Sequence, residues 1–295
     1  MCNEVQYNKQ QYKMKNKILM LPLLLSVVAC GNNEKLAQEM YNQAEQLYLS
    51  GDYIAATQWV DSISATYPQE VDVIRNGMLL QCHINQKRYE KELIEVDSLY
   101  NAATSELAAL KGRFELTREG KEQTLANYIY KGTRSKGEVR RNELRVQVTE
   151  KGDLQLTSVY CGKSKIGHTG ISVQTADGRA ARTAEIAYDG GKNYRYASGG
   201  MNIEMVTYNM AQCQDVVSFI AANGDAKIRV KYTGGKSQDL SLDKLTREAI
   251  ANSYRMAQLF VMTDSLQSRR EYGIIQLELA DRQLMKLQDK AAENK

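Results

Sequence analysis

The chain has 295 residues, of which 39 are lysine or arginine and 35 are aspartate or glutamate, and its formal net charge is +4. Residues 1–30 hold four of the lysines and one of the glutamates, which leaves the rest of the chain nearly neutral, with 35 basic and 34 acidic residues. This balance argues against a nucleic-acid partner, because phosphate binding depends on a concentrated basic surface. The part of the chain after position 30 is long enough to bury a sizeable hydrophobic core, and its length allows two domains.

An apolar segment of twelve residues, Ile18 to Ala29, lies near the N-terminus and is interrupted by Pro22. A helix that crosses a bilayer needs roughly 20 apolar residues, so this segment is too short to span one. Three lysines precede it, namely Lys13, Lys15 and Lys17. A basic region followed by a short apolar core predicts a secretory signal peptide.

The signal ends in Val27-Val28-Ala29-Cys30, which resembles the lipobox of bacterial lipoproteins. The resemblance implies cleavage before Cys30 and attachment of acyl chains to this residue, and several such chains would hold the protein firmly to a membrane. Gly31 in place of aspartate gives no reason for retention in the inner membrane. The following letters, "GNNEK", contain one acid and one base, which favours the periplasmic side of the outer membrane over export to the surface.

The residues before the signal are unusual for a secreted protein, because "MCNEVQYNKQQYK" is polar. A start at Met14 gives a signal peptide of ordinary proportions. We therefore expect Met14 to be the biological start, and residues 1–13 to come from an over-long gene assignment.

Residues 30–112 are expected to form a helical region that begins with a helical hairpin. In "AEQLYLSGDYIAATQWVDSISATYPQE", Ala44 and Ala56 let two antiparallel helices approach closely, the Gly51-Asp52 pair makes the turn, and Pro68 ends the second helix. Over about 34 residues this stretch resembles a tetratricopeptide repeat.

The next stretch, "NQKRYEKELIEVDSLYNAA", places Tyr89 at the repeat spacing but has Glu92 where a small residue is needed and lacks a closing proline. At most it is a degenerate second repeat. Because such arrays need about three units, we expect the apolar positions of this region to be covered by the C-terminal helix. The positions expected to meet are Leu79, Leu80, Leu93 and Val96 on one side and Met256, Leu259, Phe260 and Leu266 on the other.

Residues 113–240 show the period-two alternation of β-strands, most clearly in "ELRVQVTE", "DLQLTSVY" and "AKIRVKYTG". The letters "EKGD" at 150–153 predict a hairpin turn between the first two. Further strands are expected near 114–118, 125–131, 170–175, 183–189, 193–198 and 202–208, and a short helix or irregular crossover at 211–225. The expected β domain is an antiparallel sandwich or partly open barrel.

Residues 241–295 are expected to form one C-terminal helix or a pair of helices. Asp243 or Ser241 can cap its start. A heptad-like apolar seam runs through the segment and has gaps at several positions, one of which is Gly273. If the segment is a pair of helices, the break between them is expected at Gly273, because glycine destabilises a helix interior. The seam consists of Leu245, Ala249, Met256, Leu259, Leu266, Leu277, Leu284 and Leu287.

Cys82, Cys161 and Cys213 remain after the acylated cysteine and Cys2 are set aside. Their spacing fits neither a metal site nor a disulfide framework. An oxidising periplasm permits a Cys161–Cys213 disulfide, since both residues fall in the β domain. The alternative of three free thiols also stays open, because the sequence does not show whether the two residues approach each other.

No catalytic, cofactor-binding or metal-binding motif is present. The two histidines, His83 and His168, are distant in sequence and are better explained as structural residues, and no serine lies in a G-x-S-x-G motif. "YCGKSK" lacks the first glycine of a phosphate-binding loop. We therefore expect no enzymatic activity.

Tyrosine is over-represented, with 18 residues against three phenylalanines and one tryptophan. Tyr128 with Tyr130, and Tyr194 with Tyr196, each place two rings on one face of an expected strand. Such rings more often lie at the solvent-exposed edge of a sheet, where the hydroxyl reaches water, but they can also form a platform that binds a sugar or a partner protein.

Together these elements predict an α+β protein with tetratricopeptide-like helices, a central antiparallel β domain, and a long C-terminal helix that packs back on the N-terminal helices. The order resembles that of uncharacterised envelope lipoproteins of the Bacteroidetes, which implies location and no activity. The expected function is that of a lipid-anchored interaction or scaffold protein with a protein partner in the envelope. The alternative is a lipoprotein that binds a glycan or another small ligand.

Overall fold

The protein is described by a computed structural model that covers residues 32–118, 124–133 and 138–293. Cys30, its signal peptide and the expected start at Met14 lie outside the described residues. The chain divides into two compact units, one ending at Ile84 and the other beginning at Asn85. The fold is α+β, as predicted, with five described helices and two antiparallel sheets.

The first unit contains a helical hairpin made of α1 (Asn33–Leu49) and α2 (Tyr53–Thr66), followed by the first part of α3 (Val71–Lys111). Gly51 makes the turn with a φ of +83°, which favours glycine, and Asp52 caps α2 by accepting the Ala55 N–H at 3.1 Å. Ala44 and Ala56 are fully buried where the helices meet. The predicted hairpin is therefore present.

The third helix, α3, differs from the expected degenerate second repeat, because it runs without interruption for 41 residues. A second hairpin would need a turn inside this stretch, yet no glycine or proline occurs between Gly77 and Gly112. Leu80 is buried with Ala44, Ala56 and other residues of the hairpin. The hairpin, and not the C-terminal helix, is therefore the partner of Leu80 within this unit.

The β region forms two separate antiparallel sheets that do not close into a barrel. The larger has the strand order β1-β2-β3-β4-β8-β7, and the smaller has the order β10-β9-β5-β6. The strands of the larger sheet are β1 (Phe114–Thr117), β2 (Asn127–Tyr130), β3 (Glu143–Thr149), β4 (Leu154–Gly162), β7 (Asn193–Ser198) and β8 (Met201–Asn209). Those of the smaller are β5 (Gly170–Thr175), β6 (Ala180–Arg182), β9 (Ile228–Thr233) and β10 (Gln238–Ser241).

One expected strand of this region is absent, and two observed strands were not predicted. Residues 183–189 form no strand, because their backbone N–H groups donate to scattered partners: that of Ala184 donates to the Gln212 carbonyl and that of Ile186 to the Thr169 carbonyl. The short strands β6 and β10 were not predicted, since their letters, "AAR" and "QDLS", do not alternate in polarity. Residues 211–225 hold the helix α4 (Met210–Ala222), which begins with an Asn209 capping box.

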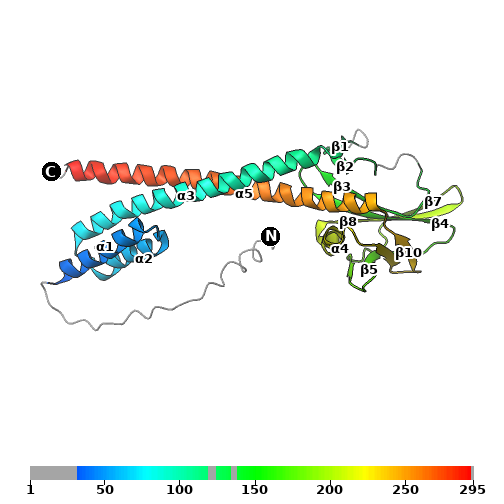
Figure 1. The fold of residues 1–295 in the computed structure, drawn as a ribbon, viewed down its shortest axis with the longest axis horizontal. Coiled ribbons are helices and arrows are strands. Elements are labelled where there is room, and N and C mark those ends of the chain that lie inside the picture. The colour runs from blue at the N-terminus through cyan, green and yellow to red at the C-terminus, as the bar shows by residue number, and fades with distance from the viewer. Residues whose placement is uncertain (1–31, 119–123, 134–137, 294–295) are drawn as a thin grey trace. The chain divides into compact units, whose positions relative to one another are not determined.

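One large core joins both sheets, α4, the second half of α3 and the long helix α5 (Lys244–Glu293). The helix α5 is continuous for 50 residues, and Asp243 caps its start by accepting the Thr246 N–H at 2.7 Å. None of the helices among the described residues combines the length and the apolar character needed to cross a bilayer. Figure 1 shows α5 beside the β-sheets in its first half and beside α3 further along.

Candidate functional site

The second half of α3 and the helix α5 form an antiparallel pair within the second unit (Figure 1). Ion pairs and polar contacts mark its register from Glu106 opposite Arg255 to Gln86 opposite Asp281. Val96, Met256, Leu259 and Leu266 are buried in the same core. The predicted packing of the C-terminal helix on the helical region is therefore confirmed for this part of α3.

Charges at the edges of this pair are sorted by helix, with acids on α3 and arginines on α5. The three pairs are Glu106–Arg255 at 2.6 Å, Asp97–Arg270 at 2.6 Å and Glu92–Arg269 at 3.1 Å. Their side chains are about half exposed, so each contributes at most about 1 kcal/mol to stability. Their main effect is to select one antiparallel register, as charges flanking a helical seam do.

Gly273 leaves room for Leu93 of α3 and does not break α5. A Cβ atom at this position would lie 2.9 Å from Cδ2 of Leu93, closer than packed carbon atoms come. The expected break at Gly273 is therefore absent. Leu93 occupies the space that a side chain at position 273 would need, so the glycine serves the packing of the two helices.

Beyond Gly273 the predicted seam residues Leu277, Leu284 and Leu287 are half-buried, and Ala280, which the heptad prediction did not include, is buried. At the start of α5 the seam prediction is wrong for Leu245, which is 42% exposed. Four large apolar side chains beyond Gly273 are exposed, namely Ile274, Ile275, Leu279 and Met285. Their exposed fractions lie between 38% and 63%. This group, here called the α5 apolar surface, is a candidate interaction site.

A second notable cluster lies in the core and is centred on Glu204, whose side chain is 1% exposed. The carboxylate accepts the backbone N–H groups of Ile166, Gly167 and His168 at 2.8 to 2.9 Å, and its Oε2 lies 3.1 Å from Nδ1 of His168. The other ring nitrogen of His168, Nε2, lies 3.0 Å from Oγ of Ser158. We name Ser158, His168 and Glu204 the buried triad.

Burial opposes ionisation of Glu204, but the N–H groups of Gly167, His168 and Ile166 and the His168 ring outweigh it and lower the pKa of Glu204. Burial also lowers the pKa of His168, more than the neighbouring Glu204 carboxylate raises it. The triad therefore consists of an ionised carboxylate and a neutral imidazole at neutral pH.

The distances within the buried triad resemble those of a serine nucleophile, a base and an orienting acid. The surroundings do not fit that role, because Ser158 and His168 are fully buried and the hydroxyl of Tyr208 lies 3.2 Å from Ser158 Oγ. A substrate has no access to this oxygen in the described structure. The triad fixes the loop after β4 to the larger sheet.

His168 is a structural residue with both nitrogens occupied, as the sequence analysis expected. Its partner Glu204 was missed, although a signal was present: Glu204 shares the inward face of β8 with the buried residues Val206 and Tyr208. A lone acid among apolar inward positions of a strand indicates a buried carboxylate with dedicated donors.

The cysteines Cys161 and Cys213 are both free, as is Cys82. Cys161 lies at the end of β4, and its thiol donates a hydrogen bond to the Val139 carbonyl. Cys213 lies on α4, and its thiol forms a hydrogen bond with the backbone of Leu156. Leu156 and Cys161 are five residues apart on one strand, or about 17 Å, so the disulfide that the sequence permitted is not formed. Burial raises the pKa of the Cys213 thiol to about 12.

The two tyrosine pairs have different surroundings. Tyr128 and Tyr130 pack edge-on against Phe114, and Tyr128 also meets Phe260, so this pair belongs to the core margin. Tyr194 and Tyr196 lie on the edge strand β7, with ring centroids 5.5 Å apart and planes inclined by 31°. This second pair is the one that could meet a ligand.

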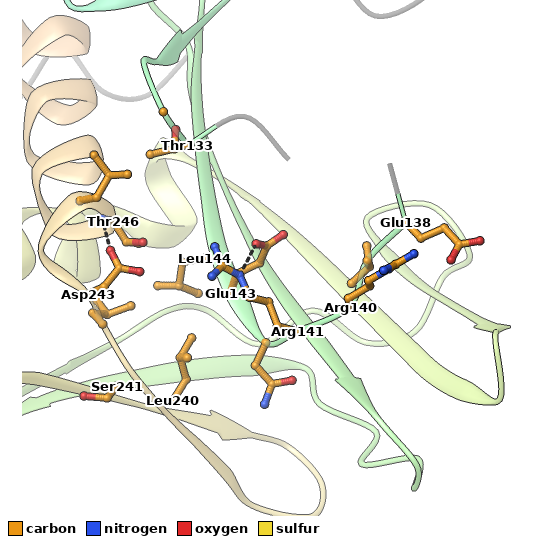
Figure 2. A pocket seen from close by; sticks show the side chains of 15 residues that line it. Thr133, Glu138, Arg140, Arg141, Glu143, Leu144, Leu240, Ser241, Asp243 and Thr246 are labelled. Carbon is orange, nitrogen blue, oxygen red and sulfur yellow. Dashed lines mark hydrogen bonds and ion pairs between the residues drawn. The ribbon is translucent and has the colours of Figure 1, made fainter. Parts of the chain in front are cut away.

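A cavity of about 390 Å³ lies where β3 begins, β10 ends and α5 starts (Figure 2). Its floor contains Leu144, Leu240, Leu242 and Leu245. Three of its polar side chains already serve the fold. Asp243 caps α5, Glu143 binds Arg145 at 2.6 Å, and Asn142 accepts the Cys161 N–H. Figure 2 shows Asp243 joined to Thr246 and Glu143 joined to Arg141.

No group of three or more histidine, cysteine or acidic side chains within the described ranges could hold a metal ion. The chain matches no protein-family model and has no significant match among curated proteins.

Proposed function

We propose that this protein is a lipid-anchored protein of the bacterial cell envelope that acts as an interaction or scaffold module. The signal peptide and the lipobox support attachment through acylated Cys30, with the protein in the outer membrane and facing the periplasm. The partner is a protein, and no catalytic step is required of the chain.

The observation that carries the interaction role is the α5 apolar surface. Its side chains lie outside the seam that faces α3, so packing of the described pair does not need them. Neighbouring apolar side chains on a protein surface, such as Ile275 and Leu279, cost free energy in water and mark sites where another molecule binds. Ile275 and Leu279 are one turn apart and form the centre of this surface.

Site-specific photo-crosslinking in intact envelopes tests the role. A photoreactive residue at Ile275 of the full-length anchored protein should give a discrete protein adduct, whereas one at Ser268, two turns earlier on the same side of α5, should give none. The variant Leu279→Ser should weaken the Ile275 adduct without lowering the melting temperature, because Leu279 is already 41% exposed. Absence of an adduct at Ile275, or an equal one at Ser268, would overturn the interaction role.

Cell fractionation tests the anchor separately. Wild-type protein should sediment with outer membranes and incorporate a palmitate probe, and the Cys30→Ser variant should do neither. The variant Cys82→Ser is the control and should keep the label, since Cys82 is a buried residue of α3. If the Cys30→Ser protein still carries the label, the lipoprotein assignment is wrong.

A further inference from the structure

A second cavity, of about 320 Å³, lies beside the edge strand β7 and is separate from the α5 apolar surface. Its walls come from β7 and β8, from the loop after β4 and from the segment before β7. The residues that matter for its chemistry are Lys165, Tyr188, Arg195, Tyr196, Asn202 and Glu204. The volume falls within the range of small-molecule sites and accommodates a ligand of about one sugar ring.

The cavity has an excess of positive charge. Glu204 is its only described acid, and that carboxylate is turned toward three backbone N–H groups and the His168 ring, which it accepts from or contacts at 2.8 to 3.1 Å. Arg195 and Lys165 contribute two cations. Lys165 has no ion pair with any residue that the structure describes. The cavity therefore favours an anion.

Arg195 is held in position at the wall of the cavity. Its guanidinium stacks on the ring of Tyr188 at 5.2 Å and donates to the His168 carbonyl at 3.3 Å. Its Nε is buried and forms an ion pair with Oε2 of Glu204 at 4.0 Å. The side chain as a whole is 31% exposed, so the guanidinium still presents positive charge to a ligand in the cavity.

Aromatic rings provide the remaining surface. Tyr188 and Tyr196 both line the cavity, and neither hydroxyl has a hydrogen-bond partner in the described part of the chain. A tyrosine offers an apolar face for the C–H groups of a sugar ring and a hydroxyl for its oxygens. The side-chain oxygen of Asn202 adds an acceptor, because its nitrogen already donates to the Lys163 carbonyl.

We propose that this cavity binds a carboxylated sugar, such as a hexuronic acid residue of an acidic glycan. The carboxylate meets Lys165 and the exposed part of the Arg195 guanidinium, and the sugar ring lies on Tyr196. The cavity near α5 in Figure 2 is a weaker candidate, because Asp243, Glu143 and Asn142 in its lining are engaged in the fold. The assignment is independent of the proposed scaffold role.

Isothermal titration calorimetry with the folded protein tests the assignment, using glucuronic acid, glucose and inorganic phosphate as probes. Glucuronic acid should bind, and glucose should bind at least about tenfold more weakly, because it lacks the carboxylate. Affinity for glucuronic acid should fall as salt is raised. Failure of glucuronic acid to bind, or equal binding of glucose, overturns the proposal, and equal binding of phosphate reduces the cavity to an unselective anion site and overturns the sugar assignment.

Variants locate the site. Lys165→Gln should weaken glucuronic acid binding about tenfold, whereas Lys163→Gln, two residues away and outside the cavity, should leave it unchanged. Tyr196→Leu should also weaken binding and Tyr196→Phe should weaken it less, because phenylalanine keeps the ring. Melting curves of all four variants should match the wild type, since these side chains are not core residues. Equal effects of Lys163→Gln and Lys165→Gln would place binding elsewhere.

Discussion

Oε2 of Glu204 lies 3.1 Å from Nδ1 of His168, and both side chains are closed to solvent. The same carboxylate accepts three consecutive backbone N–H groups of the loop after β4. One acid on β8 therefore fixes both the loop that carries Lys165 and the imidazole that supports Ser158. Several expected results depend on this contact.

Replacing Glu204 should destabilise the protein more than replacing an exposed acid. Glu204→Gln keeps one acceptor oxygen but leaves N–H groups of the loop unpaired in the core, and we expect a loss of about 2 to 3 kcal/mol in the free energy of unfolding. Urea denaturation measures it. Glu278→Gln on the exposed side of α5 is the control and should change stability by less than about 0.5 kcal/mol. Equal losses for the two variants would contradict the anchoring role.

His168 should make stability depend on pH. Its pKa is lowered by burial in the folded state from the ordinary 6.5, so between these two values the unfolded chain binds a proton that the folded chain does not. Stability is therefore complete above about pH 6.5 and falls as the pH drops toward the folded pKa. Glu204, whose pKa is also lowered, adds a further loss below its ordinary value of 4.5.

Melting temperatures between pH 5 and 8 measure the histidine contribution. Wild-type protein should melt at a lower temperature at pH 5 than at pH 8, and His168→Gln should have a flatter profile over this range. The explanation fails if His168→Gln retains the full slope.

Gly273 and Leu93 should be energetically coupled. Gly273→Ala gains about 1 kcal/mol of helix propensity but forces its Cβ against Leu93, so its net effect in the wild-type background should be small or negative. In a Leu93→Ala background the clash is gone and the same substitution should stabilise the protein by about 1 kcal/mol. A double-mutant cycle measured by urea denaturation gives the coupling, and strict additivity would show that the two residues do not touch.

The charge sorting between α3 and α5 should be reversible. Arg270→Asp places two acids together and should lower the free energy of unfolding by up to about 1 kcal/mol, and adding Asp97→Arg should restore most of it. The effect should shrink in high salt, since both side chains are about half exposed. No recovery in the double variant would mean that the pair does not help to set the register.

The three thiols should differ in reactivity under native conditions. Cys161 is partly exposed, whereas Cys213 is fully buried and burial raises its pKa to about 12, which leaves almost no thiolate at neutral pH. Iodoacetamide should therefore label Cys161 first, and mass spectrometry after unfolding should find Cys82 and Cys213 unmodified and reduced. A mass consistent with a Cys161–Cys213 bond would contradict the free state of both residues.

The sequence by itself determined the parts of this protein that depend on local patterns. The hairpin at Gly51-Asp52 follows from a turn that needs a residue with positive φ and an acid that caps the next helix. The seam in the second half of α5 follows from the heptad spacing of its leucines, because this spacing places them on one face of the helix. The strands β3, β4 and β9 follow from strict alternation, because one face of each is buried.

Only the tertiary structure decided the features that depend on residues far apart in the chain. The sequence predicted a possible helix break at Gly273, whereas in the structure Leu93, which is 180 positions earlier in the chain, occupies the space beside this glycine. Glu204 meets His168, 36 residues away, and the cavity at β7 gathers Lys165, Tyr188 and Arg195 from three segments. Such contacts arise when the sheets and helices pack, and the energy of a buried polar group depends on the partners that packing brings to it.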